Sequence, residues 1–172
     1  MIRAAAVLVA FVFIAGCDSE AEVDSVPLGT FELRLSGADD VQFSGDATFI
    51  GPVAAPPAEI PLTIHLLNRT PSTPTDRDRG IQIQDPDGVL NRVGTYPLGP
   101  DADVEVTYVD LGGARGRVDP VAEGTLEITT LANDRIVGRI DAKLDTRGAA
   151  LSDVLEVSFA AASAPDNALG ED

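Results

Sequence analysis

Only a few residues of this chain combine a reactive side chain with a spacing that suits catalysis or metal binding. His65 is the single histidine, and the chain has no G-x-S-x-G turn that would present a serine to it. A zinc site with one His and no Cys would need three carboxylates, which is an unusual ligand set. Because His65 lies opposite Ile64 and Leu66 in an alternating segment, we expect it on the outer face of a strand. We therefore assign it no catalytic or metal-binding role.

Acidic pairs in turn-rich segments are the next candidates, as oxygen ligands for a cation: Asp76/Asp78, Asp85/Asp87 and Asp101/Asp103. A calcium loop of the EF-hand type also needs an oxygen ligand at position 5 and Glu at position 12. Counted from Asp85, those positions hold Val89 and Tyr96, and Asp-Pro-Asp-Gly is in itself a favourable turn. Whether these loops bind cations stays open at this point, and we predict no metal ligand and no cofactor.

A glycine- and arginine-rich segment, Gly112 to Arg117 (GGARGR), has loop amides and guanidinium groups that suit an anion. It lacks the Lys-Ser/Thr of a P-loop, and no helix pattern follows it, so a loop with two solvated arginines is the simpler interpretation. Paired carboxylates for glycoside hydrolysis stay open, but a chain with no Trp and two Tyr offers a poor platform for sugars. We predict no catalytic residue and a protein that is not an enzyme.

The only cysteine, Cys17, closes an apolar run at the amino terminus. Arg3 supplies a positive charge, and Ala4 to Ile14 are uncharged and mostly apolar. This length suits the central region of a signal peptide and is too short to cross ~30 Å of hydrocarbon as a helix. Ile14-Ala15-Gly16-Cys17 resembles the lipobox of bacterial lipoproteins, a resemblance that covers only the first seventeen residues.

The lipobox resemblance implies a definite chemistry for the amino terminus. Cleavage would fall between Gly16 and Cys17, and the Cys17 sulfur would be linked to diacylglycerol. The expected location is the bacterial cell envelope, with the protein anchored to a membrane through Cys17 and facing the periplasm or the exterior. Asp18 follows the cysteine directly, which in some Gram-negative bacteria disfavours transfer to the outer membrane, so the choice of membrane stays open.

Composition and charge exclude some classes of partner. The chain has 172 residues, of which 44% are hydrophobic, and this suits one globular domain. Its formal charge of −16 repels nucleic acid, so we predict no nucleic-acid partner. The sequence identifies no protein or small-molecule partner and no oligomeric state.

Period-2 alternation between turn residues predicts an all-β domain after the amino terminus. We expect eight strands, which are Thr30 to Leu35, Val41 to Phe49, Ile60 to Leu67, a short strand around Ile81 and Ile83, Asp103 to Tyr108, Gly124 to Leu131, Arg135 to Thr146 and Val154 to Ala161. Alternation favours antiparallel sheet with one wet face, and short turns favour a meander. We expect the Pro-rich stretches between strands, such as 86–100, to be connecting loops.

Eight such strands close into a small barrel or form two packed sheets. We favour the closed, calycin-like barrel over the sandwich, because closure removes unpaired edges and because inward Gly45, Ala47, Gly138 and Ala142 suit a curved sheet. The expected organisation is a signal peptide at 1–16, an acidic flexible tether at 17–27, one β-domain at 28–163 and a disordered tail at 164–172.

Two function classes follow from these predictions. The first is a lipid-anchored, non-enzymatic binding or interaction module of the envelope. The second is a carrier of a small ligand with a lipocalin-like barrel, although the chain lacks the tryptophan of the lipocalin signature. A hydrolase with a carboxylate or metal site is a weaker third.

Overall fold

Nine strands, joined in one sheet, make up the regular structure of the described residues. The computed structural model describes residues 26–37, 40–51, 61–68, 79–111, 116–146 and 153–164. The strands are β1 (Thr30–Ser36), β2 (Val41–Ile50), β3 (Leu62–Leu67), β4 (Arg79–Asp85), β5 (Gly94–Leu98), β6 (Glu105–Asp110), β7 (Arg117–Leu131), β8 (Arg135–Leu144) and β9 (Val154–Ser163). The predicted all-β class is confirmed.

The sheet closes on itself as an eight-stranded antiparallel meander with β5 as an extra strand. β1 pairs with β2 on one side and with β9 on the other, and β7 pairs with β8. The remaining neighbours follow chain order, apart from β5, which pairs only with β7. Closure gives the eight barrel strands a partner on each side, so the predicted barrel is confirmed over the sandwich.

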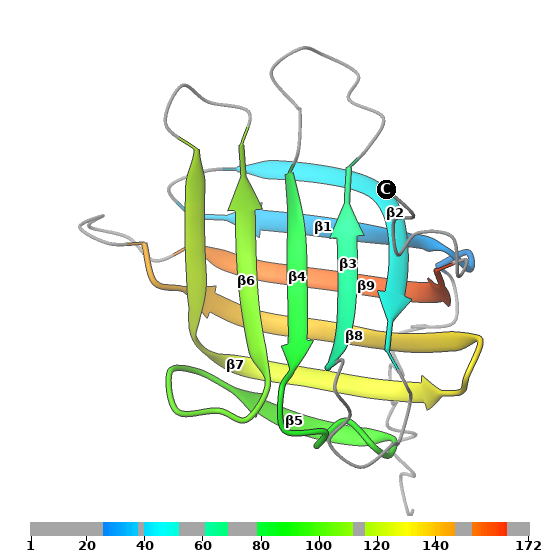
Figure 1. Ribbon diagram of the computed structural model, residues 1–172. Helices are drawn as coiled ribbons and strands as arrows, with labels where there is room; N and C mark the ends of the chain where they lie inside the picture. The colour runs from blue at the N-terminus through cyan, green and yellow to red at the C-terminus, as the bar shows by residue number, and fades with distance from the viewer. Residues whose placement is uncertain are drawn as a thin grey trace, which may run out of the picture.

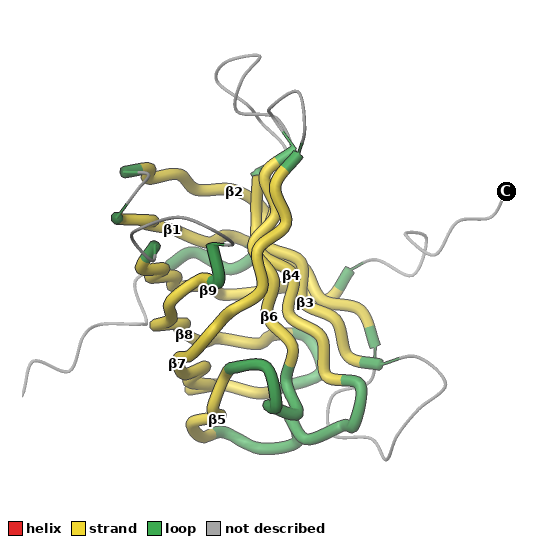
Figure 2. Tube along the Cα trace, turned by 90° about the vertical axis from the view of Figure 1, so that its left-hand side faces the viewer, coloured by secondary structure: helices red, strands yellow, loops and turns green. Residues whose placement is uncertain are grey.

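Two long strands turn the corners between the layers of the barrel. β2 pairs with β1 over Val41 to Asp46 and with β3 over Asp46 to Ile50, while β7 pairs first with β6 and then with β5. In Figure 1, β3, β4 and β6 run vertically, whereas β1, β9 and β8 run horizontally behind them. Figure 2 shows the two layers from the side. The front layer, formed by β3, β4 and β6, therefore has an outward face that is separate from the outward face of β1, β8 and β9.

The barrel interior is filled by aliphatic and aromatic side chains. Alternate residues of every barrel strand point inward, as the period of 2 requires, and form one buried cluster. Phe31 and Phe43 meet edge to face, with ring centroids 5.9 Å apart. Gly138 is inward as predicted, and a Cβ there would lie 2.5 Å from the carbonyl oxygen of Glu127 and 2.8 Å from Cζ of Phe159. Only glycine permits that close approach.

The sequence missed one strand and half of another. β5 lies inside the stretch 86–100, which we expected to be a connecting loop, and β7 begins at Arg117, seven residues before the expected start. Ile60, the expected first residue of the third strand, lies outside the described residues. In the expected strand Asp103 to Tyr108, the alternate apolar residues Val104, Val106 and Tyr108 are all buried, although Val104 precedes β6.

Candidate functional site

Several predicted site residues lie outside the described residues. Cys17, the predicted lipidation site, is one of them, as are the pair Asp76/Asp78 and residues 112–115 of the glycine- and arginine-rich segment. The chain enters the described structure at Val26. This residue packs on Val137 and Ala160, on the outer face of β8 and β9.

Asp85 has a structural task that occupies both of its carboxylate oxygens. One oxygen accepts a hydrogen bond from the backbone N–H of Val89, and the other accepts one from Leu90, each at 2.8 Å. The side chain is buried, so its carboxylate takes the place of water as the hydrogen-bond acceptor for two backbone amides of the loop that follows β4. Asp85 therefore fixes the loop that follows β4.

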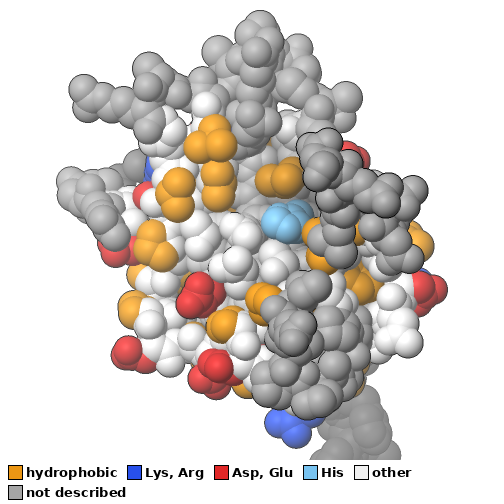
Figure 3. All heavy atoms as spheres, in the orientation of Figure 1, with side chains coloured by type: hydrophobic (Ala, Val, Ile, Leu, Met, Phe, Trp, Pro, Cys, Tyr) orange, Lys and Arg blue, Asp and Glu red, His pale blue; other side chains and the backbone are white. Residues whose placement is uncertain are grey.

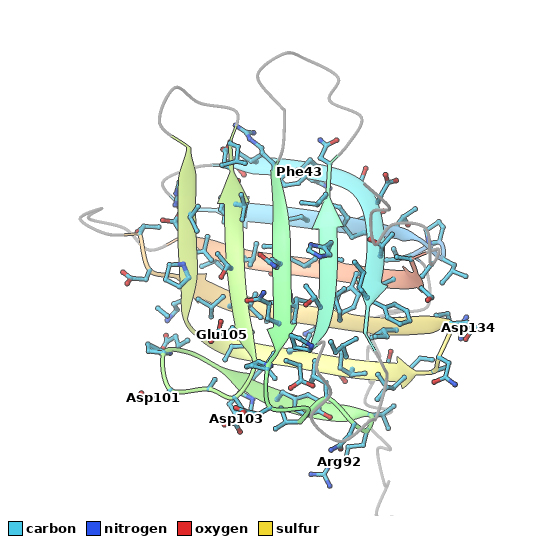
Figure 4. All side chains as sticks on the ribbon, in the orientation of Figure 1. Phe43, Arg92, Asp101, Asp103, Glu105 and Asp134 are labelled. Atoms are coloured by element: carbon cyan, nitrogen blue, oxygen red, sulfur yellow. The ribbon has the colours of Figure 1, made fainter. Side chains whose placement is uncertain are left out.

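Two aspartates from different predicted pairs meet at one end of the barrel. Asp87 and Asp103 line the same open cleft of about 660 Å³, together with Arg92 and Tyr96 of the β5 region. The Tyr96 hydroxyl donates to the Arg92 carbonyl at 2.5 Å. In Figure 4, Asp101, Asp103 and Glu105 lie at this end, away from Phe43. Within the described ranges, no group of three or more His, Cys, Asp or Glu residues is placed to hold a metal ion.

The opposite end of the barrel holds an inward-facing ion cluster that the sequence did not predict. Arg117 forms ion pairs with Asp119 and with Asp153, the latter at 2.6 Å, and its guanidinium lies 5.9 Å from the ring centroid of Tyr108. Arg79 pairs with Asp110 at 2.9 Å in the same layer. We expected Arg117 to be a solvated loop residue; instead it is a strand residue that faces buried carboxylates.

Electrostatics keep the Arg117 guanidinium charged. Burial by itself lowers the pKa of Arg117, but the hydrogen bond to Asp153 and the charge of Asp119 outweigh it and raise the pKa above its ordinary value. Asp153 is fully buried, and Asp119 nearly so. The cluster therefore forms a layer of paired charges at this end of the barrel.

A second open cleft, of about 650 Å³, lies beside this ionic layer. Inward-facing side chains such as Phe31, Phe43, Asn68 and Arg79 line it, and polar residues of β1 and β2 complete its rim. Below it the barrel is packed, so the cleft is a mouth at the end of the barrel. It offers aromatic surface and one guanidinium that is already paired with Asp110.

The outer face of the front layer carries very little charge, and we call it the low-charge face. It consists of the outward residues of β3, β4 and β6, which are Thr63, His65, Leu67, Gly80, Gln82, Gln84, Glu105, Thr107 and Val109. Among these nine, only Glu105 is charged. Figure 3 shows His65 and scattered apolar side chains on this side of the molecule, with acidic side chains towards its lower part. Val118 and Leu111, at its border, are more than half exposed.

The opposite layer has a different surface. Its outward positions on β1, β8 and β9 hold Glu32, Arg34, Arg139, Asp141, Lys143 and Glu156. Arg139 pairs with Asp141 at 2.6 Å, and Lys143 pairs with Glu123 of β7 at the same distance. The low charge of the front layer is therefore particular to that layer.

The sequence predicted His65 on an outward position but did not identify the face that it shares with Gln82 and Gln84. The register shows it: Gln82 pairs with His65 on one side and with Thr107 on the other. An available signal was the run of Thr, Gln and His at the outward positions of three strands, in a chain of net charge −16. The order of the strands was needed to bring these positions together.

No helix long and apolar enough to cross a bilayer occurs in the part of the chain that the structure describes. No protein-family model matches the chain, and neither a curated protein nor a solved structure matches it. The function therefore has to be argued from the residues themselves.

Proposed function

We propose that this protein is a lipid-anchored, non-enzymatic binding module of the bacterial cell envelope. The lipobox-like segment that ends at Cys17 supports the anchor. Each buried methylene contributes ~0.8 kcal/mol to membrane binding, and one acyl chain holds a protein only marginally, so the two chains of a diacylglyceryl group make the anchor firm. The β-domain then faces the periplasm or the exterior.

The low-charge face is the observation that supports a binding role. Only Glu105 is charged among its nine outward positions, whereas the outward positions of β1, β8 and β9 include Glu32, Arg34, Arg139, Asp141, Lys143 and Glu156. Charged residues are depleted at the centres of protein interfaces, because their desolvation is costly. Val26 packs on the opposite layer, so the low-charge face lies on the side of the barrel away from the point where the amino-terminal segment attaches.

Photo-cross-linking in intact producing cells tests this role. A photo-activatable residue replaces Thr107 on the low-charge face or, as the matched control, Glu127 on an outward position of β7 in the charged layer. We expect discrete protein adducts from position 107 and few from position 127. Equal labelling at both positions, or none at 107, contradicts the proposal.

A lipocalin-like carrier is the second candidate, and the mouth cleft beside Phe43 favours it. Eight strands enclose just enough space for side chains or one small ligand, and the cleft of about 650 Å³ is of ligand size. The packed interior below it means that a ligand would sit at the mouth. Saturable binding of the fluorophore anilinonaphthalene sulfonate, weakened by Phe43→Ser and not by Val154→Ser on the outer face of β9, is expected of a carrier; absence of saturable binding contradicts it.

A further inference from the structure

The two strands that turn the corners of the barrel, β2 and β7, each have an edge that one barrel neighbour covers only in part. β7 pairs with β6 over Arg117 to Pro120 and then with β5 over Gly124 to Ile128, while β8 pairs along the other edge. β2 pairs with β3 only over Asp46 to Ile50. Among the described strands, β1 is therefore the only partner of Val41 to Gly45, and their other edge is uncovered. Figure 2 shows β5 at the lower end of the layer behind β3, β4 and β6, and β2 at its upper end.

The uncovered edge of β2 presents backbone hydrogen-bonding groups. The N–H of Ala47 donates to the carbonyl of Gly29, on the β1 side, at 2.8 Å. Alternate residues of an antiparallel strand bond to the same neighbour, so Gln42 and Ser44 direct their N–H and C=O groups to the uncovered side. Charged residues and proline usually protect a sheet edge, and the stretch 41–45 (VQFSG) contains neither. The edge is therefore suited to pair with a further strand.

An apolar groove lies along the same edge. It is the mouth cleft of about 650 Å³ described above, and the stretch 41–45 forms part of its lining. Val41 and Phe43 point inward but are only partly buried, whereas Ala47 and Phe49, further along the same face of β2, are fully buried. A strand added to the edge would place alternate side chains over Val41 and Phe43 and would complete their burial.

Strand β5 shows, within the same molecule, what covers an edge of this kind. It has five residues, Gly94–Leu98, which pair antiparallel with Gly124 to Ile128 of β7. Two alternate residues, Tyr96 and Leu98, pack against the barrel core. The uncovered stretch of β2, at 41–45, has the same length. The fitting occupant is therefore an extended segment of about five residues with large apolar side chains at alternate positions.

From these observations we infer that the edge of β2 binds an extended segment of a partner protein, which joins the sheet as a further strand. Main-chain hydrogen bonds to Gln42 and Ser44 supply affinity, and side chains at alternate positions select the sequence. The inward side chains of the segment are apolar, because they contact Val41 and Phe43. The site is separate from the low-charge face, so the inference does not depend on the binding role proposed for that face.

Charge at the rim favours basic residues at the outward positions of the segment. Asp46 is exposed and follows Ser44 on the outward side of β2. A residue added opposite Ser44 lies diagonally from Asp46 at ~7–8 Å, within reach of a lysine or arginine side chain. Glu32 and Arg34 are on β1, one strand further away, and offset each other. The guanidinium inside the cleft is already paired, and the formal charge of −16 adds long-range attraction for a basic segment.

Fluorescence anisotropy with the full-length protein, purified from membranes in detergent, tests the inference. The probe is a labelled peptide with blocked ends, Thr-Val-Lys-Phe-Lys-Val-Thr, whose sequence reads the same in both directions. Two further peptides of equal charge carry N-methyl groups either on the lysines or on the apolar residues. In the antiparallel orientation of β5, the N–H groups of the lysines face β2. We expect saturable binding of the probe, about tenfold weaker binding with N-methyl lysines, and little change with N-methyl apolar residues.

Ser44→Pro tests the same edge from the side of the protein. Proline removes the N–H of Ser44, its ring occupies the place of the added strand, and proline is tolerated where an N–H faces away from the sheet. Ser44→Ala keeps the N–H and is the matched control. We expect the probe to bind about tenfold more weakly to Ser44→Pro than to Ser44→Ala, with the same circular dichroism for both. If Ser44→Pro does not fold, the N-methylated peptides decide, because they need only the unsubstituted chain.

The outcomes separate this inference from the proposed functions. Equal binding of the three peptides, or no saturable binding of the probe, overturns the inference. A dimer of the unsubstituted chain that Ser44→Pro converts into a monomer also overturns it, because a second copy then covers the edge. Anilinonaphthalene sulfonate needs the aromatic surface of the cleft but not the edge, so its binding without that of the probe supports a carrier instead. Cross-linking from Thr107 does not involve β2 and judges the low-charge face separately.

Discussion

Arg117 on β7 donates a hydrogen bond of 2.6 Å to Asp153, a fully buried carboxylate 36 positions later in the chain. The same guanidinium pairs with Asp119, so one cation neutralises acids from two segments at the end of the barrel. A buried carboxylate without a counter-ion is costly, and this pair therefore ties the beginning of β7 to the segment that leads into β9.

Arg117→Leu should destabilise the protein markedly. Breaking a buried ion pair leaves an uncompensated charge, which usually costs ~3–5 kcal/mol, and because the Arg117 side chain is 29% exposed we expect a smaller loss of about 2–3 kcal/mol. Urea unfolding at pH 7 measures the loss. Lys143→Met, which breaks a solvent-exposed pair with Glu123, is the control and should leave the midpoint nearly unchanged. Equal effects of the two substitutions would show that the Arg117 pair is not a structural contact.

Asp85→Ala should loosen the loop between β4 and β5. Its two carboxylate oxygens satisfy the amides of Val89 and Leu90, and a buried amide without an acceptor costs about 1–3 kcal/mol. Hydrogen exchange should accelerate at those two amides in Asp85→Ala and stay unchanged in Asp87→Ala, where the side chain is exposed. Unaltered exchange at Leu90 in the first variant would refute this role.

The exposed Glu123–Lys143 pair should be visible in the pH titration of the folded protein. The hydrogen bond and charge of Lys143 lower the pKa of Glu123, and those of Glu123 raise the pKa of Lys143. The Glu123 contribution to stability is therefore present above the unfolded pKa of glutamate and is lost as the pH falls through the lower folded pKa. The Lys143 contribution is present below the unfolded pKa of lysine and is lost as the pH rises through the higher folded pKa. Carboxyl NMR should show Glu123 titrating lower in the unsubstituted protein than in Lys143→Met; identical midpoints would argue against the pair in solution.

The alternation of apolar and polar residues was sufficient to predict the antiparallel all-β fold, and the inward small residues favoured its closure into a barrel. Strands such as β1 and β9 alternate regularly, with Leu33 and Val157 inward and Glu32 and Glu156 outward. Side chains of opposite character on the two faces of one strand fix which face is buried. Short turns join successive strands into a meander, and the pairing of the first strand, β1, with the last, β9, closes it.

The alternation failed where the barrel interior is polar. At the beginning of β7 the inward residues are Arg117 and Asp119, and the outward residue Val118 is exposed, so the pattern is inverted. The partner that makes this favourable, Asp153, is distant in sequence and could not be paired with Arg117 from the sequence alone. β5 was missed because it contains Pro97 and pairs with a single neighbour, a position where proline is tolerated.

The low-charge face could be predicted only in part. Alternation predicts Gln82 and Gln84 at the outward positions of β4. The strands on either side of β4 are β3 and β6, and β6 is its neighbour only because β5 lies outside the barrel. Only then do His65 and Thr107 lie on either side of Gln82. A surface built from several strands is therefore assembled by the topology from residues that are unremarkable one by one.

Mass spectrometry of the native protein, purified from membranes of its producing cells, tests the proposed anchoring most directly. We expect the amino-terminal peptide to begin at Cys17 and to carry the mass of a diacylglyceryl group on the sulfur, with residues 1–16 removed. A peptide that begins at Met1, or a Cys17 with an unmodified thiol, would contradict the account of this protein as a membrane-anchored binding module.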